Sequence, residues 1–302
     1  MQFSLQTPRQ QKYTGTSKFP SAYFAGAESS NPVKQEILSS VSHRPWPLPS
    51  APWRMTQRWN DLLFAHWPVP AASIRSLVPE ELKLDTFDGS AWVGVVPFWM
   101  DQIQFRGIPR MPGAHSFPEL NLRTYVRDRR TNMCGVYFFS LDATNPLAVA
   151  IARTFYRLPY YWSRMKIEER RPGDFLYTSS RLLTRKPVRF SARYHSLGAS
   201  RKMAESRPGS LEYFLTERYC LFTTNRKGKV LRGNIHHAPW PLEEAEAEID
   251  ATELAAAHGF ELPDTKPVLY YARELAVYIW PLELVHGSLL TVPAPVQVAK
   301  SV

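Results

Sequence analysis

A few polar side chains in apolar surroundings carry the chemistry that this sequence can support. Glu119 lies in an apolar, strand-like segment, where burial would raise the pKa of its carboxyl group and let it act as a general acid or base. Arg153 lies in an apolar helical segment, where its guanidinium could bind a ligand carboxylate. Tyr160 and Tyr161 could donate hydrogen bonds to a carbonyl oxygen. The structural alternatives are an ion pair of Glu119 with Arg123 or Arg153, and simple packing of both tyrosines.

Metal and cofactor chemistry have little support in the sequence. The histidines that could gather at one site are His66, His115, His236 and His237. None has a metal-ligand spacing such as His-Glu-x-x-His, and the adjacent pair at 236–237 would point to opposite faces of a strand. Cys134 and Cys220 are the only cysteines and form no CxxC pair, so we interpret them as buried thiols. Because phosphate-binding glycine loops and a GxSxG motif are also missing, we predict no metal, no cofactor and no serine nucleophile.

Composition excludes several classes of protein. The 302-residue chain is 44% hydrophobic, which suffices for a packed core. Its apolar runs are far shorter than the roughly 20 residues that cross a bilayer, and it shows no secretory signal, so we expect a cytoplasmic protein without a membrane span. The formal net charge is +10, but no nucleic-acid motif accompanies it. We interpret the charge as a solvated basic face and expect no nucleic-acid partner. A homo-oligomer stays open.

The pattern along the chain predicts one domain. Residues 1–52 are polar and aperiodic, which predicts a poorly ordered N-terminal extension; the domain is expected over 53–285, with a C-terminal tail over 286–302. We predict strands at 57–66, 90–98, 119–127, 135–142, 188–194 and 268–280, hairpins at 166–182 and 218–235, and helices at 147–156 and 243–258. Many strands and few helices indicate an α+β fold with an antiparallel, barrel-like sheet that encloses a cavity.

Several segments carry a resemblance to a known family: LLFAHWP at 62–68, LVPEELKLD at 77–85, FPELNLRTY at 117–125, VYFFSLDATNP at 136–146 and GNIHHAPWPL at 233–242. Together they resemble the YqjF-like family of uncharacterised proteins, also called domain of unknown function 2071, over about residues 53–285. That family is in turn distantly similar to acetoacetate decarboxylase. The resemblance implies an acetoacetate-decarboxylase-like fold, with a β-barrel-like sheet around an internal cavity.

The resemblance to the decarboxylase also places residues. Glu119 falls on the segment where the decarboxylase carries a cavity carboxylate, and Arg153 precedes the helix-ending Pro159 as an arginine does there. In the decarboxylase two adjacent lysines follow that proline and support a Schiff base, whereas this sequence has Tyr160 and Tyr161. A tyrosine cannot form an imine with a ketone, so we expect the imine chemistry to be absent.

Two small-molecule functions remain open from the sequence, beside a third, nucleic-acid association through the basic segment, which no motif supports. The first is a small-molecule enzyme that acts on a small carboxylate or carbonyl compound in the barrel cavity, with Glu119 and Tyr160 as catalytic residues and with Arg153, Tyr161 and His66 binding the substrate. The second is a non-catalytic protein that binds a small metabolite in the same cavity. The residues alone do not decide between catalysis and binding.

Overall fold

The computed structural model describes residues 11–13, 37–108, 116–198 and 206–285. The strands are β1 (Gln11–Tyr13), β2 (Met55–Val69), β3 (Leu82–Leu84), β4 (Ala91–Phe105), β5 (Phe117–Asp128), β6 (Cys134–Ala143), β7 (Tyr160–Arg171), β8 (Asp174–Arg181), β9 (Arg189–Ser196), β10 (Cys220–Thr224), β11 (Val230–His236), β12 (Glu243–Asp250) and β13 (Val268–Leu284). The helices are α2 (Ala71–Arg75), α3 (Pro146–Phe155), α4 (Leu211–Thr216) and α5 (Thr252–Ala256). None of the helices in these ranges is long and apolar enough to cross a membrane. His115 and the predicted tail 286–302 lie outside the described residues.

Local sequence signals explain where α3 and α4 begin. The side chain of Asn145 accepts hydrogen bonds from the backbone N–H groups of Leu147 and Ala148, at 3.0 and 3.1 Å, and a proline occupies the first position of α3. Ser210 caps α4 in the same way by accepting from the N–H of Tyr213 at 3.2 Å. The predicted helix at 147–156 is confirmed within a residue. Both predicted hairpins are present as β7–β8 and β10–β11, although β7 begins at Tyr160, before the predicted 166, and β10 begins at Cys220, after the predicted 218.

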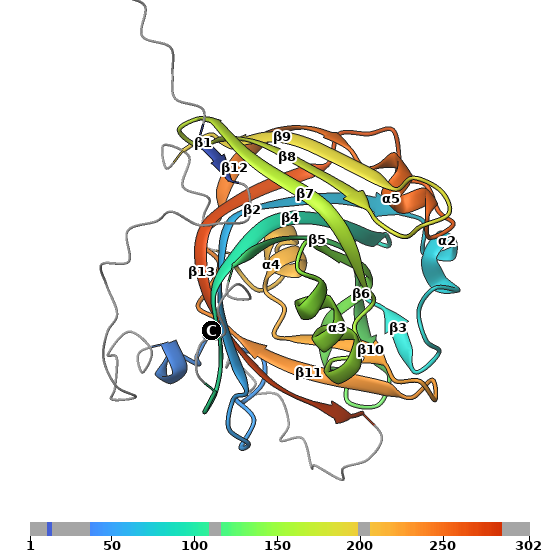
Figure 1. Ribbon diagram of the computed structural model, residues 1–302. Coiled ribbons are helices and arrows are strands. Elements are labelled where there is room, and N and C mark those ends of the chain that lie inside the picture. The colour runs from blue at the N-terminus through green and yellow to red at the C-terminus, as the bar shows by residue number, and fades with distance from the viewer. Residues whose placement is uncertain (1–10, 14–36, 109–115, 199–205, 286–302) are drawn as a thin grey trace, which may run out of the picture.

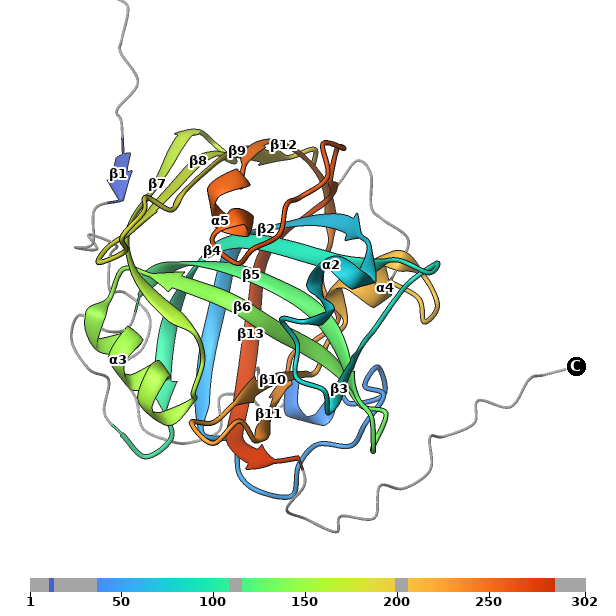
Figure 2. The same ribbon diagram turned by 90° about the vertical axis from the view of Figure 1, so that its right-hand side faces the viewer.

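One mixed sheet curves until it closes on itself, as Figures 1 and 2 show. Pairing of β13 with β2 closes a first ring through β13, β11, β10, β6, β5, β4 and β2. Pairing of β7 with β6 closes a second ring through β7, β8, β9, β12, β13, β2, β4, β5 and β6. Paired strands are antiparallel except where β6 runs parallel to β7 and to β10. The predicted barrel-like sheet with few helices is therefore confirmed, with these parallel contacts added.

The strands shared by both rings bury both of their faces. On β5, Leu120 and Leu122 point into a core shared with β7, β8 and β9, whereas Tyr125 belongs to a second core on the opposite face. Helix α3 contributes Val149 to this second core and α4 contributes Leu215. Figure 2 shows α3 and α4 at opposite ends of the sheet, so the two helices close the two ends of the first ring.

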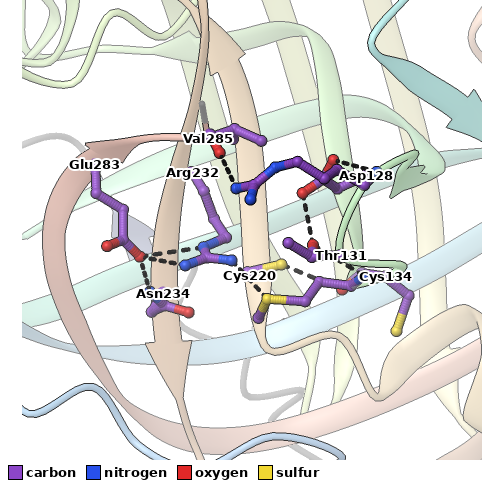
Figure 3. Close-up of polar contacts among 10 residues, drawn as sticks. Asp128, Thr131, Cys134, Cys220, Arg232, Asn234, Glu283 and Val285 are labelled. Carbon is purple, nitrogen blue, oxygen red and sulfur yellow. Dashed lines mark hydrogen bonds and ion pairs between the residues drawn. The ribbon is translucent and has the colours of Figure 1, made fainter. Parts of the chain in front are cut away.

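A polar cluster fixes the first ring where β10 and β11 meet β6 and β13 (Figure 3). Glu283 of β13 accepts hydrogen bonds from Arg232 and Asn234 of β11, at 2.6 and 2.8 Å. The buried thiol of Cys220 on β10 donates to the carbonyl oxygen of Cys134 on β6 at 3.1 Å, and both cysteines are free. The Cys220–Cys134 hydrogen bond strengthens the short parallel pairing of β6 with β10, and the Glu283 contacts join β11 to β13.

Part of the predicted N-terminal extension, residues 37–52, is among the described residues. These residues lie against the barrel, where Arg44, only 9% exposed, donates to the carbonyl oxygen of Ile235 at 2.7 Å. Further along, the indole of Trp280 donates to the carbonyl oxygen of Ala51 at 2.7 Å. These hydrogen bonds hold residues 37–52 against β11 and β13.

The helix predicted at 243–258 is wrong over its first half. Residues 243–250 form β12, which pairs with β9 through Ala245 to Asp250. Ala245, Ala247 and Ile249 alternate with glutamates and pack partly against the core, a period of two rather than a helical period. Helix α5 begins only at Thr252.

Candidate functional site

The core between α3 and α4 contains a cavity of about 140 Å³. A cavity of about 150 Å³ can hold a molecule of the size of benzene. Apolar side chains from every side of the first ring line it, among them Trp59, Phe98, Phe138, Leu141, Ile151 and Trp240. Its main polar lining residues are Glu119, Asn121, Arg123, Tyr160, Arg218 and His237. A few polar groups in an otherwise apolar concavity are typical of a small-molecule binding site.

Strand β5 supplies a row of polar side chains to the cavity. Successive side chains of a strand alternate between its faces, so Glu119, Asn121 and Arg123 point to one side while Leu120 and Leu122 point to the other core. The register irregularity between β5 and β6 lies on the β6 side. Leu122 pairs with Ser140 and the next residue, Arg123, pairs with Phe138, so the extra, unpaired residue belongs to β6. The alternation along β5 is therefore unbroken from one end of the cavity to the other.

Glu119 lies at the α3 end of the row and is 3% exposed. Burial raises the pKa of its carboxyl group from the ordinary 4.5 to about 7, with Asp142 adding to the rise and hydrogen bonds from Tyr160 and Asn121 opposing it. The Tyr160 hydroxyl donates to Glu119 Oε2 at 2.6 Å. No arginine or lysine within the described ranges forms an ion pair with this carboxyl. The group can thus give or take a proton near neutral pH.

Tyr160 is positioned by the start of β7. It follows Pro159 directly, its backbone pairs in parallel with Leu141 of β6, and its carbonyl oxygen accepts a hydrogen bond from Arg153 Nε at 2.6 Å. Burial, and then the neighbouring Glu119, raises the pKa of the Tyr160 hydroxyl well above its ordinary value. This hydroxyl stays protonated and can act as a hydrogen-bond donor in the cavity.

Arg153 and Tyr161 lie outside the cavity. Arg153 is exposed on α3, and its guanidinium lies 5.7 Å from the centre of the Tyr161 ring. Tyr161 follows Tyr160 on the strand and therefore faces the other way, with the guanidinium of Arg181 at 4.0 Å from its ring centre. The structure brings Glu119 and Tyr160 together but leaves these two side chains on the opposite side of β7.

His66 is fully buried beside the cavity rather than in its lining. Its Nε2 lies 2.6 Å from the hydroxyl of Tyr125, which itself donates to the carbonyl oxygen of Leu215 at 2.8 Å. Burial, followed by the charge of Arg123, lowers the pKa of His66 well below its ordinary value, so the ring is neutral. Gly94 leaves space for this ring, because a Cβ there would lie 3.0 Å from His66 Cδ2.

Arg123 is a cavity residue that sequence reasoning considered only as an ion-pair partner. It is 9% exposed, and its guanidinium lies 5.4 Å from the ring centre of Phe64 and 5.9 Å from that of Tyr125. Its Nε has no hydrogen-bond partner within the described part of the chain, and neither has Oδ1 of the neighbouring Asn121. The alternation of Glu, Asn and Arg with leucines along β5 was the signal that could have placed it with Glu119.

A second arginine in the lining, Arg218, is neutralised by protein groups. Its Nη1 binds Oδ2 of the buried Asp85 at 2.7 Å, and its Nε donates to the carbonyl oxygen of Phe214 at 2.7 Å. The nearby His237 is held by the carbonyl oxygen of Ala238 at 2.7 Å from its Nδ1, and burial lowers its pKa to about 3. These groups form a fixed polar wall that does not change its charge near neutral pH.

No lysine lies among the described residues that line the cavity. Lys166, the next lysine after Tyr160 and Tyr161, has a side chain that is 45% exposed and pairs with Glu168 on the same strand. An imine with a ketone inside the cavity would need an amine there. The described lining of the cavity therefore holds a carboxyl group but no amine.

This architecture, a closed and mostly antiparallel sheet around a small cavity, is the acetoacetate-decarboxylase-like fold. The enduracididine biosynthesis enzyme MppR, complexed with the condensation product of pyruvate and imidazole 4-carboxaldehyde, superposes with a TM-score of 0.53 at 9% identity, over 78% of this chain and 90% of MppR. An acetoacetate decarboxylase-like enzyme from Sphingomonas wittichii RW1 gives a TM-score of 0.52 at 12% identity, over 80% of this chain and 97% of that enzyme. An acetoacetate decarboxylase superposes with a TM-score of 0.51 at 14% identity, over 83% of this chain and 97% of the decarboxylase.

Sequence similarity then assigns the family. The DUF2071 family, described as "Uncharacterized conserved protein", matches residues 56–276. The uncharacterized protein YqjF of Bacillus subtilis strain 168 is 46% identical over 235 residues, which cover 78% of this chain and 94% of YqjF. The chain belongs to the DUF2071 family, and the family predicted from its motifs is confirmed.

Proposed function

We propose that this protein is a small-molecule enzyme that moves a proton to or from a carbonyl or carboxylate compound held in the cavity. Glu119 is the general acid-base and Tyr160 is its hydrogen-bonding partner. The observation that carries the proposal is the buried Glu119 carboxyl, whose pKa is raised to about 7 in a largely apolar cavity. A carboxyl group tuned in this way by burial is typical of catalytic sites. Structural neighbours whose names describe them as enzymes support it.

The step is a proton transfer without an imine. The ionised carboxylate of Glu119 takes a proton from the carbon next to a substrate carbonyl, and the electron pair of that C–H bond moves onto the carbonyl oxygen to give an enolate. The Tyr160 hydroxyl turns its hydrogen bond from Glu119 to this oxygen and stabilises the negative charge. In the reverse direction Glu119 returns the proton to the carbon. Decarboxylation and isomerisation of oxo acids share such an enolate, and hydration also needs a positioned acid-base.

Deuterium exchange tests this step without knowledge of the natural substrate. Levulinate and pentan-2-one both carry hydrogens next to a ketone, and proton NMR in D₂O follows their loss. The wild type should accelerate exchange, Glu119→Gln should abolish the acceleration, and Tyr160→Phe should reduce it by a factor of about 10² to 10³, as for one lost donor to an enolate oxygen. The matched control is Glu253→Gln, a surface carboxylate paired with Arg189. Equal exchange rates in the wild type and Glu119→Gln would refute the role of Glu119.

The alternative is a metabolite-binding protein without chemistry. The mainly apolar lining and the absence of a lysine among the described cavity residues favour it, because such a site binds well without a reactive amine. It predicts saturable binding of levulinate or pentan-2-one with no exchange above the rate in buffer. The exchange experiment separates the two functions directly.

A further inference from the structure

We infer that Arg123 binds the carboxylate of the ligand at the α4 end of the cavity, so that the ligand is an acid whose carboxylate is separated by several apolar carbons from the carbon that reacts at Glu119. The inference rests on the proposed function and names the substrate class of the same cavity. It predicts γ-oxo or longer acids rather than 2-oxo acids, in which the two groups are adjacent.

No described residue supplies a counter-ion for Arg123. A buried guanidinium is costly unless it is paired and hydrogen-bonded. Arg218, in the same lining, has Asp85 at 2.7 Å, whereas Arg123 forms no ion pair with any described residue and its Nε is unpartnered. The Phe64 and Tyr125 rings lie beside its guanidinium, and the Tyr125 hydroxyl is hydrogen-bonded to it, but a single hydroxyl oxygen is neither a counter-ion nor the two-oxygen fork of a carboxylate. A ligand carboxylate would supply that fork with two parallel hydrogen bonds.

Glu119 and Arg123 lie at opposite ends of the polar row on β5. At about 3.3 Å per residue, the Cα atoms of Glu119 and Arg123 lie about 13 Å apart along β5. The surroundings confirm that they face different ends: Glu119 is bound by Tyr160 near α3, while Arg123 lies over Tyr125, whose hydroxyl binds the carbonyl oxygen of Leu215 in α4. These two ends favour a ligand whose carboxylate lies several atoms away from its reacting carbon.

The lining between the two ends of the row is mainly apolar. Apolar side chains such as Val96, Phe98 and Leu221 border the cavity, and they suit hydrocarbon rather than a second charge. Asn121 lies midway along the row with an unpartnered Oδ1, which would accept a hydrogen bond from a hydroxyl group of the ligand. The cavity of about 140 Å³ limits this ligand to a compact acid.

Calorimetry with three probes tests the inference. Levulinate carries a carboxylate and a ketone separated by two methylene groups, pyruvate carries them on adjacent carbons, and pentan-2-one has no carboxylate. The wild type should bind levulinate more tightly than either other probe. Arg123→Met should weaken levulinate binding at least about tenfold, as loss of a charge-assisted hydrogen bond does, and should leave pentan-2-one binding unchanged.

Two further variants keep the test decisive. Arg123→Lys retains the charge without the planar fork and should bind levulinate with intermediate affinity, so it replaces Arg123→Met if that variant fails to fold. Arg185→Met removes an exposed arginine and should change no affinity. Wild-type levulinate affinity in folded Arg123→Met or Arg123→Lys would overturn the inference, as would tighter binding of pyruvate than of levulinate, or no binding of levulinate.

The outcomes separate this inference from the proposed function. Levulinate binding that depends on Arg123, together with deuterium exchange that Glu119→Gln leaves intact, would refute the role of Glu119 and retain the carboxylate site. Exchange that depends on Glu119, together with levulinate binding that ignores Arg123, would retain the proton transfer and refute the carboxylate site.

Discussion

Replacement of Glu119 by glutamine should change how the stability of the protein depends on pH. The pKa of this carboxyl group is raised from 4.5 to about 7 in the folded protein, so between these values the folded state holds a proton that the unfolded state has lost. Stability therefore decreases as pH rises through this window, the sign expected when the unfolded state binds fewer protons. At 1.36 kcal/mol per pKa unit, the wild type should lose about 3 kcal/mol across the window from this group alone.

Urea unfolding of the wild type and Glu119→Gln at a series of pH values measures the contribution of Glu119 to the free energy of unfolding. The free energy of unfolding of the wild type minus that of the variant should fall by about 3 kcal/mol as pH rises from below 4.5 to above 7, while contributions from the buried histidines cancel. Glu253→Gln is the control. Arg189 lowers the pKa of the Glu253 carboxyl group, so the contribution of Glu253 to stability is lost only as pH falls below the ordinary pKa of a glutamate. A difference between wild type and Glu119→Gln that is constant with pH would refute a raised pKa at Glu119.

Three further predictions follow from the same contacts. Tyr160→Phe removes the hydrogen-bond donor that lowers the pKa of Glu119. The pH at which half of the Glu119 contribution to stability is lost should therefore rise by about one unit, measured by the same urea series. Gly135→Ala should lower stability by about 3 kcal/mol in urea unfolding, since its Cβ would lie 2.6 Å from the carbonyl oxygen of Cys220 in the parallel β6–β10 pair, and a wild-type midpoint would contradict this packing. Borohydride with pentan-2-one should leave the protein mass unchanged, because no described cavity residue is a lysine; a reduced adduct on Lys166 or any other lysine would show imine chemistry after all.

Local signals in the sequence predicted the parts of the fold that depend on neighbouring residues. Asn145 and the proline after it marked the start of α3, and the glycine-containing turns marked both hairpins. The parallel pairing of β6 with β7 and β10 could not be read in the same way, because it joins segments that no turn connects. The glutamate-rich segment of β12 was mistaken for a helix, since its alternation with Ala245, Ala247 and Ile249 is weakly apolar.

Only part of the candidate site could be predicted from the sequence, because the direction of its side chains depends on how the sheet closes. Glu119 was selected by resemblance and strand context, and the structure shows it beside Tyr160 in the cavity. Arg123 was missed because alternating polar residues on a strand usually mark a solvent face, whereas closure of the sheet turns this face inward. Arg153 and Tyr161 were placed near the site along the chain, but the alternation of β7 and the orientation of α3 direct them away from the cavity.

A carbon-13 NMR titration of the Glu119 side-chain carboxyl carbon tests the central claim most directly. Glutamate labelled at this carbon gives one signal per side chain, and the signal missing in Glu119→Gln identifies the residue. We predict a midpoint near 7 in the free protein and a changed chemical shift when levulinate fills the cavity. A midpoint near 4.5, the ordinary value for this group, or a signal that levulinate leaves unchanged, would contradict the account of Glu119 as the acid-base of a ligand cavity.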